Sequence, residues 1–193
     1  MIRLLLGAIA LALATTTLVA QNRQPTCKGC PGTYISNDEI QAYVKRAMAK
    51  NIIDQQVRAV DIGKSNVAIG VVHRGRLTTP GAVAEHHQVS EVYHVMSGAA
   101  TLVLGPDLVG QEERPATDNA VRNLNGPGSN SKSIRNGVTH ELKVGDVVVI
   151  PAGTGHWFTK IDDHISYLMI RVDPDKVAPL KNEAASKADL AGK

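Results

Sequence analysis

The chain has 193 residues, of which 43% are hydrophobic, so it can bury one core of ordinary domain size. Its net charge of +3 is small and its basic residues do not cluster, which argues against a nucleic-acid partner. Only 3% of the residues are aromatic, so few flat side chains are available for stacking on bases or sugars.

The first twenty residues have the pattern of a secretory signal. Arg3 provides a positive start, residues 4–14 form an apolar run, and residues 18–20 form a suitable cleavage site. The apolar run is short for a membrane span. We therefore expect residues 1–20 to be a signal peptide, the protein to be exported to the periplasm or the exterior, and no membrane segment to remain after cleavage.

Residues 21–56 read as an N-terminal loop followed by a helix. Cys27 and Cys30 have the spacing of a redox pair, but the βαβ unit that usually holds such a pair is not visible. In an oxidising compartment, a local disulfide that ties down the N-terminus is the favoured interpretation. Ser36 and Glu39 form a capping box ahead of apolar residues at helical spacing, which predicts a helix over 37–50.

Residues 57–174 predict an all-β domain. Short β-rich segments, such as 67–72, 92–96 and 147–150, are separated by glycine and proline without intervening helices, as in a sandwich or barrel. Residues 105–140 are polar and rich in Gly, Asn and Ser, which predicts a long loop that acts as a lid or a binding loop, or is disordered. The polar tail, residues 175–193, is expected to be peripheral.

Two segments carry groups that bind metals. Residues 81–98 contain adjacent histidines and two glutamates, and residues 145–156 end in His156. Imidazole and carboxylate together suit first-row transition metals. Side chains two apart on a strand share a face, so Glu85, His87, Glu91 and Tyr93 are expected on one face.

The two segments resemble the paired motifs of the cupin superfamily. The first cupin motif places a glycine, a His-x-His pair, a glutamate and a second glycine at set spacings, and the second places a glycine, Pro-x-Gly and a histidine. The matching residues are Gly81, His87, Glu91 and Gly98 in the first segment, and Gly145, Pro151, Gly153 and His156 in the second. The resemblance covers roughly residues 66–172 and implies a cupin β-barrel, a double-stranded β-helix of the jelly-roll kind.

The first motif departs from the cupin pattern and leaves two registers open. If His87 is the second histidine of the pair, Glu85 occupies the place of the first. If His86 is the ligand, Ala84 occupies that place, and a bulge is required in the strand. The resemblance implies Glu91 and His156 as ligands in either register.

The resemblance further implies one divalent transition metal (Fe, Mn, Cu, Ni or Zn) in a small cavity, and a small-molecule substrate. The leading hypothesis is a dioxygenase-type oxidoreductase. The alternatives are a non-redox lyase, isomerase or decarboxylase, and a binding protein without catalysis. Because cupins commonly pair through sheet edges, a homodimer is expected.

Other polar residues near the motifs are candidates for supporting roles. Glu85, Tyr93 or Lys160 would serve as acid or base in a non-redox reaction, although Tyr93 is also explained as a residue that lines the barrel. Arg74 and Arg76 follow a predicted strand and could contact an anion, but ordinary surface charge is the simpler interpretation.

Overall fold

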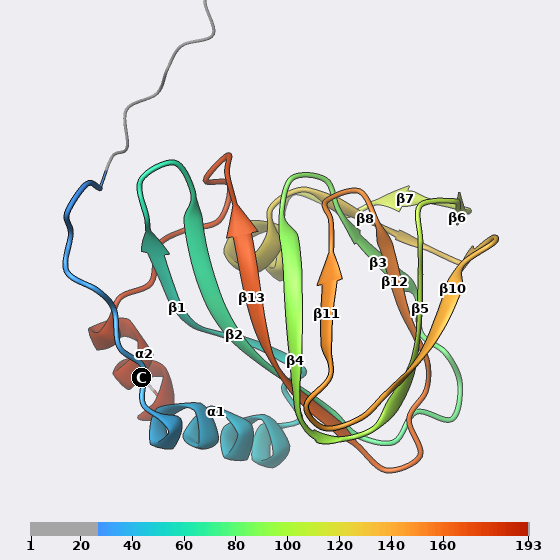
Figure 1. Ribbon diagram of the computed structural model, residues 1–193, viewed down its shortest axis with the longest axis horizontal. Helices are drawn as coiled ribbons and strands as arrows, with labels where there is room; N and C mark the ends of the chain where they lie inside the picture. Colours follow the sequence, from blue (N-terminus) through green and yellow to red (C-terminus); the bar gives the residue numbers. More distant parts are fainter. Residues whose placement is uncertain (1–26, 193) are drawn as a thin grey trace, which may run out of the picture.

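The computed structural model describes residues 27–192, and the predicted signal peptide lies outside the described residues. Two antiparallel sheets face one another (Figure 1). The five-stranded sheet contains, in spatial order, β1 (Asp54–Asp61), β2 (Asn66–Arg74), β13 (Ile165–Asp173), β4 (Ser90–Gly98) and β11 (Val147–Ile150). The six-stranded sheet contains β10 (Val138–Leu142), β5 (Ala100–Gly105), β12 (Gly155–Lys160), β3 (Val83–His86), β8 (Gly128–Ser131) and β7 (Glu112–Glu113). The prediction of an all-β domain is confirmed, and its strands form two facing antiparallel sheets.

The core fills the space between the two sheets. Along β4, Tyr93 and Val95 are buried while His94 between them is exposed. On β11, Val148 and Ile150 point inward and alternate with exposed neighbours. This alternation is the pattern of strands with one buried face, and it places the side chains of both sheets in one shared interior.

Helix α1 (Asn37–Lys50) forms where the capping box predicts it. The Ser36 hydroxyl accepts a hydrogen bond from the Glu39 amide at 3.1 Å, which satisfies one free donor of the first turn. Asn51 ends the helix in the left-handed conformation. The buried side of the helix, with Ile40 and Tyr43, packs with residues of β1 and β2 outside the barrel.

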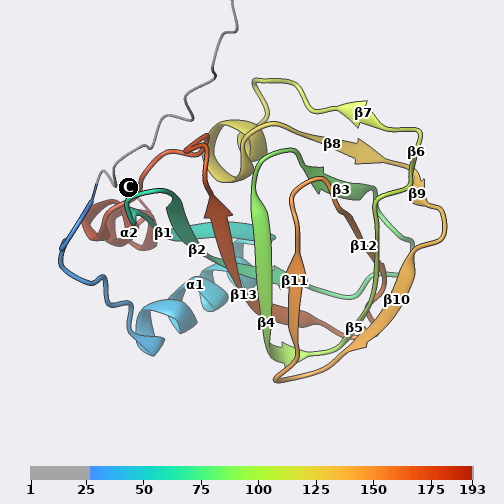
Figure 2. The same ribbon diagram turned by 45° about the horizontal axis from the view of Figure 1, so that its top comes forward.

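The segment from residue 105 to 140 differs from the predicted loop. It contains β6 (Leu108–Val109), β7, the π-helix η1 (Ala120–Asn125), β8, β9 (Ser133–Ile134) and β10. β8 pairs with β3, and β10 pairs with β5, so these strands depend on partners distant in the sequence. Their polar residues give no local strand signal, and tertiary pairing decides their conformation. Figure 2 shows η1 beside the upper ends of β13 and β4.

The tail is more closely attached than predicted. Helix α2 (Glu183–Leu190) lies against β1 and α1, and Ser186 is fully buried. The Ser186 hydroxyl accepts a hydrogen bond from Arg58 at 3.0 Å, and Lys181 joins Ala59 through a pair of backbone hydrogen bonds. The tail therefore adds a layer to the outside of the five-stranded sheet.

Cys27 and Cys30 form a local disulfide at the start of the described chain, as the spacing predicts. Among residues 27–192, no helix is both long enough and apolar enough to cross a membrane.

A substitution at Gly98, the last residue of β4, tests whether the turn after the first motif requires glycine. Its φ is +75°, and an added Cβ would lie 1.9 Å from the His164 carbonyl oxygen. Gly145 also has a positive φ, +91°, but an added Cβ there has open space. We expect Gly145→Ala to cost about 1–2 kcal/mol of unfolding free energy from backbone strain alone. Gly98→Ala should cost clearly more, because the collision adds to the strain. Urea denaturation measures both, and equal losses would contradict the predicted collision.

Candidate metal centre

Three side chains from the two facing sheets converge at one end of the barrel interior. His86 ends β3, His156 is the second residue of β12, and Glu91 lies on β4 in the opposite sheet. One ligand atom from each of the three lies within 4.8 Å of the others, and all three side chains are buried. Nε2 of His86 is 3.3 Å from Oε1 of Glu91, and Nε2 of His156 is 3.7 Å from Oε2.

A break in strand geometry decides which of the two adjacent histidines enters this cluster. β3 ends at His86, the chain bends at residues 87–88, and β4 begins at Ser90. The His86 carbonyl accepts a hydrogen bond from the Gly153 amide, and the His87 amide donates to the Pro127 carbonyl. The alternation of faces therefore does not continue from β3 into β4. Ala84 and His86 line the cavity with Glu91, as in the register that requires an irregular strand.

The structure does not bring His87 or Glu85 into the cluster. The expectation that they share a face with Glu91 fails because the bend resets the alternation. The Glu85 carboxylate accepts a hydrogen bond from Ser129 at 2.8 Å and lies 2.9 Å from Nδ1 of His87. Nε2 of His87 lies 2.8 Å from Glu113. Hydrogen bonds with these two carboxylates raise the pKa of His87.

The second motif places His156 by a tight turn. Gly153 adopts a φ of +79°, which favours glycine, directly before the return strand β12. Nδ1 of His156 lies 3.3 Å from the Thr154 carbonyl oxygen, which holds the ring with Nε2 toward Glu91. Burial is the main reason that the pKa of His156 falls to about 4, so the ring is neutral near pH 7. A neutral imidazole oriented by its second nitrogen is a suitable metal ligand.

Glu91 carries a buried negative charge. Its burial alone would raise its pKa, but the nearby His86, His156 and Arg171 outweigh burial and hold the pKa well below its usual range. Nε of Arg171 lies 3.5 Å from Oε1, and the Tyr93 hydroxyl donates to Oε2 at 2.8 Å. Oε1 has no hydrogen-bond partner among the described residues. An ionised carboxylate with a free oxygen beside two imidazoles fits a divalent metal ion.

His86 needs its neighbours to adjust before it can bind a metal. Its Nδ1 lies 3.3 Å from Nη1 of Arg114, and its Nε2 lies 3.2 Å from the side-chain nitrogen of Asn125. Both neighbours are donors, so a neutral imidazole can accept from only one of them, from Arg114 at Nδ1 or from Asn125 at Nε2. Binding of a metal through Nε2 requires the proton on Nδ1, and Arg114 must then turn away from that nitrogen.

Tyr93 lies in the site and its hydroxyl holds one oxygen of Glu91. Burial and the neighbouring Glu91 raise the pKa of its phenol well above the usual value. The hydroxyl therefore stays protonated and holds Glu91, and it is a poor base. Lys160 is exposed and pairs with Asp162 at 3.0 Å, away from the cluster.

Three residues around the cluster have no motif spacing that could reveal them: Arg114, Asn125 and Arg171. Arg114 follows β7, Asn125 ends η1 and Arg171 lies on β13. Only the packing of distant segments brings them to the histidines and Glu91. The Gly- and Asn-rich composition of residues 125–130 was the one signal available, and it predicted a binding loop without naming a residue.

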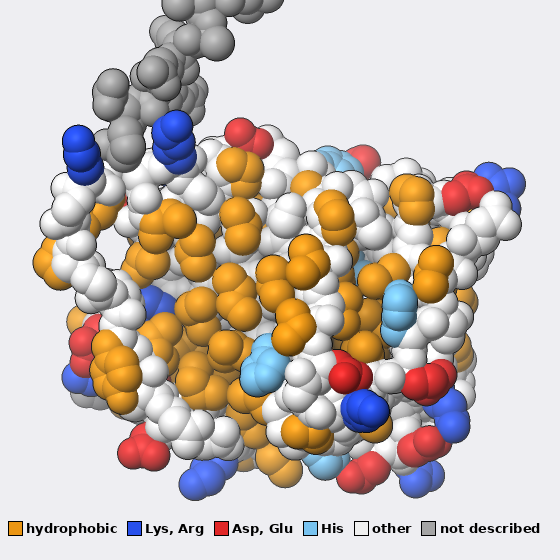
Figure 3. All heavy atoms as spheres, in the orientation of Figure 1, with side chains coloured by type: hydrophobic (Ala, Val, Ile, Leu, Met, Phe, Trp, Pro, Cys, Tyr) orange, Lys and Arg blue, Asp and Glu red, His pale blue; other side chains and the backbone are white. Residues whose placement is uncertain are grey.

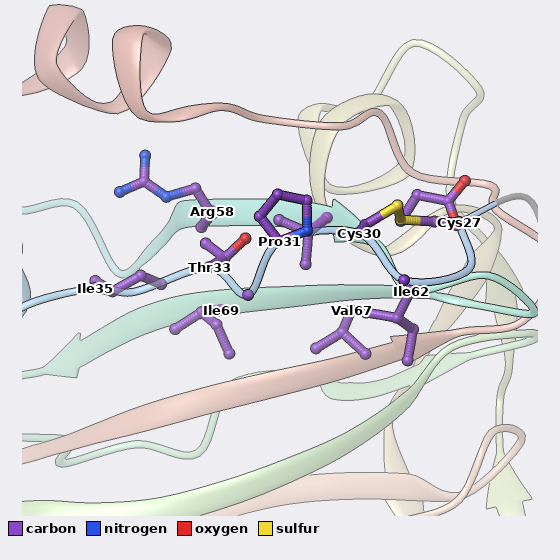
Figure 4. A pocket seen from close by; sticks show the side chains of 13 residues that line it. Cys27, Cys30, Pro31, Thr33, Ile35, Arg58, Ile62, Val67 and Ile69 are labelled. Atoms are coloured by element: carbon purple, nitrogen blue, oxygen red, sulfur yellow. A yellow bond between two sulfur atoms is a disulfide. The ribbon is translucent and has the colours of Figure 1, made fainter.

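The cluster lies in a cavity of about 180 Å³. A larger cavity of about 440 Å³ lies between the N-terminal segment and the outer face of β1 and β2 (Figure 4). That cavity is lined by the disulfide and by apolar residues such as Ile35 and Ile69. Of its two charged residues, Arg58 hydrogen-bonds both carboxylate oxygens of Glu39, and Asp61 pairs with Lys176 at 2.9 Å. The groups that can bind a metal therefore occupy the smaller cavity.

No protein-family model and no curated protein sequence matches this chain. Similar solved structures include BH2720 from Bacillus halodurans, which is 15% identical with a TM-score of 0.45 over 83% of this chain and 97% of that one. The DMSP lyase DddQ from Ruegeria pomeroyi is 16% identical with a TM-score of 0.39, and the match spans 64% of this chain but 47% of the lyase. An RmlC-like cupin with a double-stranded β-helix fold from Methanocaldococcus jannaschii is 13% identical, with a TM-score of 0.37 over 64% and 84% of the two chains. At these values we draw no functional conclusion from the likenesses.

The two adjacent histidines provide a direct test of the metal centre. We expect His86→Ala to lose most of its bound metal, because it removes one of three clustered ligands. His87→Ala is the matched control and should retain the metal, since His87 contacts Glu85 and Glu113 instead. Metal content of tag-free protein, measured by mass spectrometry, distinguishes the variants. Full occupancy in both would show that the cluster is not the metal site.

Proposed function

We propose that this protein is a metal-dependent enzyme of the cupin type, with one divalent transition metal held by His86, Glu91 and His156. The observation that carries the proposal is the convergence of these three buried side chains in one small cavity. Two imidazoles and one carboxylate are the ligand set of non-haem iron oxygenases, which keep open positions for substrate and O₂. A dioxygenase-type reaction on a small organic molecule is therefore the function that the site supports best.

The residues around the cluster have distinct tasks in this proposal. When bound, the metal would supply Lewis acidity and an open position for a reactant. Tyr93 donates its hydroxyl hydrogen to one oxygen of Glu91 and so fixes the orientation of that carboxylate. Asn125 contacts Nε2 of His86, so its side chain would have to move when a metal binds that nitrogen.

A non-redox lyase, isomerase or decarboxylase has less support. Such a reaction commonly needs a positioned base, and the three candidates from the sequence do not supply one. Glu85 is engaged with Ser129 outside the cluster, Lys160 is exposed, and the raised pKa of Tyr93 keeps its phenol protonated, so that it offers no basic oxygen. A binding protein without turnover remains the third outcome of the test.

Metal analysis and oxygen uptake together test the proposed function. Purified without a histidine tag, the protein should contain about one iron or copper ion per chain and consume O₂ with its substrate. Glu91→Gln keeps the shape of the side chain but removes the charge, and it should lose most of the metal. Glu113→Gln, at an exposed carboxylate that contacts His87, is the control and should keep it. Bound zinc without O₂ uptake would exclude the oxygenase reaction, and absence of any metal would exclude the metal centre.

We also propose that two copies associate through the outer face of the five-stranded sheet. Apolar side chains gather on this face (Figure 3), and Val147, Val149 and Val172 are exposed there. An exposed apolar face of this kind is typical of interaction surfaces.

Light scattering tests the association. Wild-type protein should have the mass of a dimer, and the double variant Val147→Glu, Val149→Glu should be a monomer, because burying two carboxylates is costly. Val144→Glu is the control, since Val144 has the same exposure as Val147, 60%, but lies in the turn before β11. A monomeric mass for the wild-type protein would refute the dimer.

We propose, finally, that the protein acts outside the cytoplasm. The signal-like pattern of residues 1–20 supports this location, and so does the disulfide between Cys27 and Cys30, because disulfides persist in oxidising compartments.

A further inference from the structure

The cavity that holds the candidate metal ligands has an excess of positive charge. Three guanidinium groups, those of Arg74, Arg114 and Arg171, lie in or beside it, against two carboxylates, Asp54 and Glu91. Arg171 serves both carboxylates: it hydrogen-bonds Asp54 and lies 3.5 Å from Glu91. Among residues 27–192, no carboxylate lies within ion-pair distance of Arg74 or Arg114.

Arg74 is the last residue of β2 and is held in the cavity wall by aromatic neighbours. Its guanidinium carbon lies 4.9 Å from the centre of the Phe158 ring, and its Nε is buried without a hydrogen-bond partner among the described residues. A buried guanidinium donor with no acceptor is costly, so an acceptor from outside the chain would be favoured there.

Arg114 is fixed on the other side of His86 by neutral acceptors. It donates to the carbonyl oxygens of Glu85 and Ser129 at 2.9 and 2.8 Å, and to the side chain of Asn130 at 3.0 Å. These bonds hold the side chain between β3 and β8. The charges of Asp118, Glu85, Glu91 and Glu113 act on the guanidinium, but none of the four forms an ion pair with it among the described residues. A divalent metal ion at the cluster would add to the excess. A neutral substrate would leave this charge uncompensated in an interior of low dielectric.

We infer that the substrate of this site is a small carboxylate, with its charged group held by Arg74 and Arg114 and its apolar part against Val72 and Met169. This inference rests on the proposed function and names its substrate class. Guanidinium groups bind carboxylates through paired, charge-assisted hydrogen bonds. The cavity of about 180 Å³ has the volume of about six water molecules and sets the size limit at a few carbon atoms.

Binding of matched acids and amides tests the inference. Propanoate and butanoate are compared by calorimetry with propanamide and butanamide, which have the same shape without the charge. The wild-type protein should bind the acids at least about tenfold more tightly than the amides. Arg74→Gln should abolish that preference, because it removes one of the two guanidinium groups that distinguish a carboxylate from an amide. Arg135→Gln is the control, because Arg135 is exposed and pairs with Asp107 at 3.0 Å, and it should bind as the wild type does.

Arg114→Gln provides a second variant if Arg74→Gln does not fold, as judged by thermal unfolding, and it should also lose the preference for acids. Equal affinity for acids and amides in the wild-type protein, or an unchanged preference in both arginine variants, would overturn the inference.

Measurements on metal-loaded and metal-stripped protein separate this inference from the proposed function. A preference for acids that survives metal removal and depends on Arg74 supports the arginine site, even if the protein retains no metal as isolated. A preference that disappears with the metal and is unaffected by either arginine variant would mean that the metal alone binds the acid. Retained metal without any preference would leave the proposed metal centre intact and exclude the carboxylate.

Discussion

The buried carboxylate of Glu91 is the constraint on which the rest of the site depends. An ionised carboxylate is stable inside a protein only when nearby groups compensate its charge. Here the compensation comes from four directions: His86 and His156 from the opposite sheet, Tyr93 from the same strand, and Arg171 from the neighbouring strand β13. One oxygen of Glu91 still has no hydrogen bond from residues 27–192, and that oxygen faces the imidazole of His86.

Arg171 extends this constraint across the five-stranded sheet. It is almost completely buried, and it joins Glu91 to Asp54 and Gln56 on β1. The room for its guanidinium is provided by Gly70, where an added Cβ would lie 2.9 Å from Nη1 of Arg171. The charge of Glu91 on β4 is therefore linked to side-chain packing on β2 and β1, and a substitution of one of these partners is expected to affect the others.

The charged residues of the cavity connect the proposed metal centre with the proposed substrate. Arg171 accounts for both carboxylates of the cavity, and Arg74 and Arg114 are left with neutral partners. A metal ion would compensate the negative charge of Glu91. It would also increase the excess of positive charge beside the arginines, so that an anion would be bound more strongly there. In the proposed function, metal binding and recognition of a small acid would therefore be complementary parts of one electrostatic arrangement.

The sequence by itself determined the two-sheet fold, the helix over 37–50, the local disulfide and the positions of Glu91 and His156, because alternation, capping and motif spacing are local signals. It left His86 and His87 as alternatives, since strand parity cannot reveal the bend at residues 87–88. It also read residues 105–140 as a loop, because β8 and β10 are strands only by pairing with β3 and β5. Arg74 was a candidate for contact with an anion, but only the tertiary structure places it in the cavity. Tertiary structure alone brought in Arg114, Asn125 and Arg171, which come from separate elements and meet only when the two sheets close around the cavity.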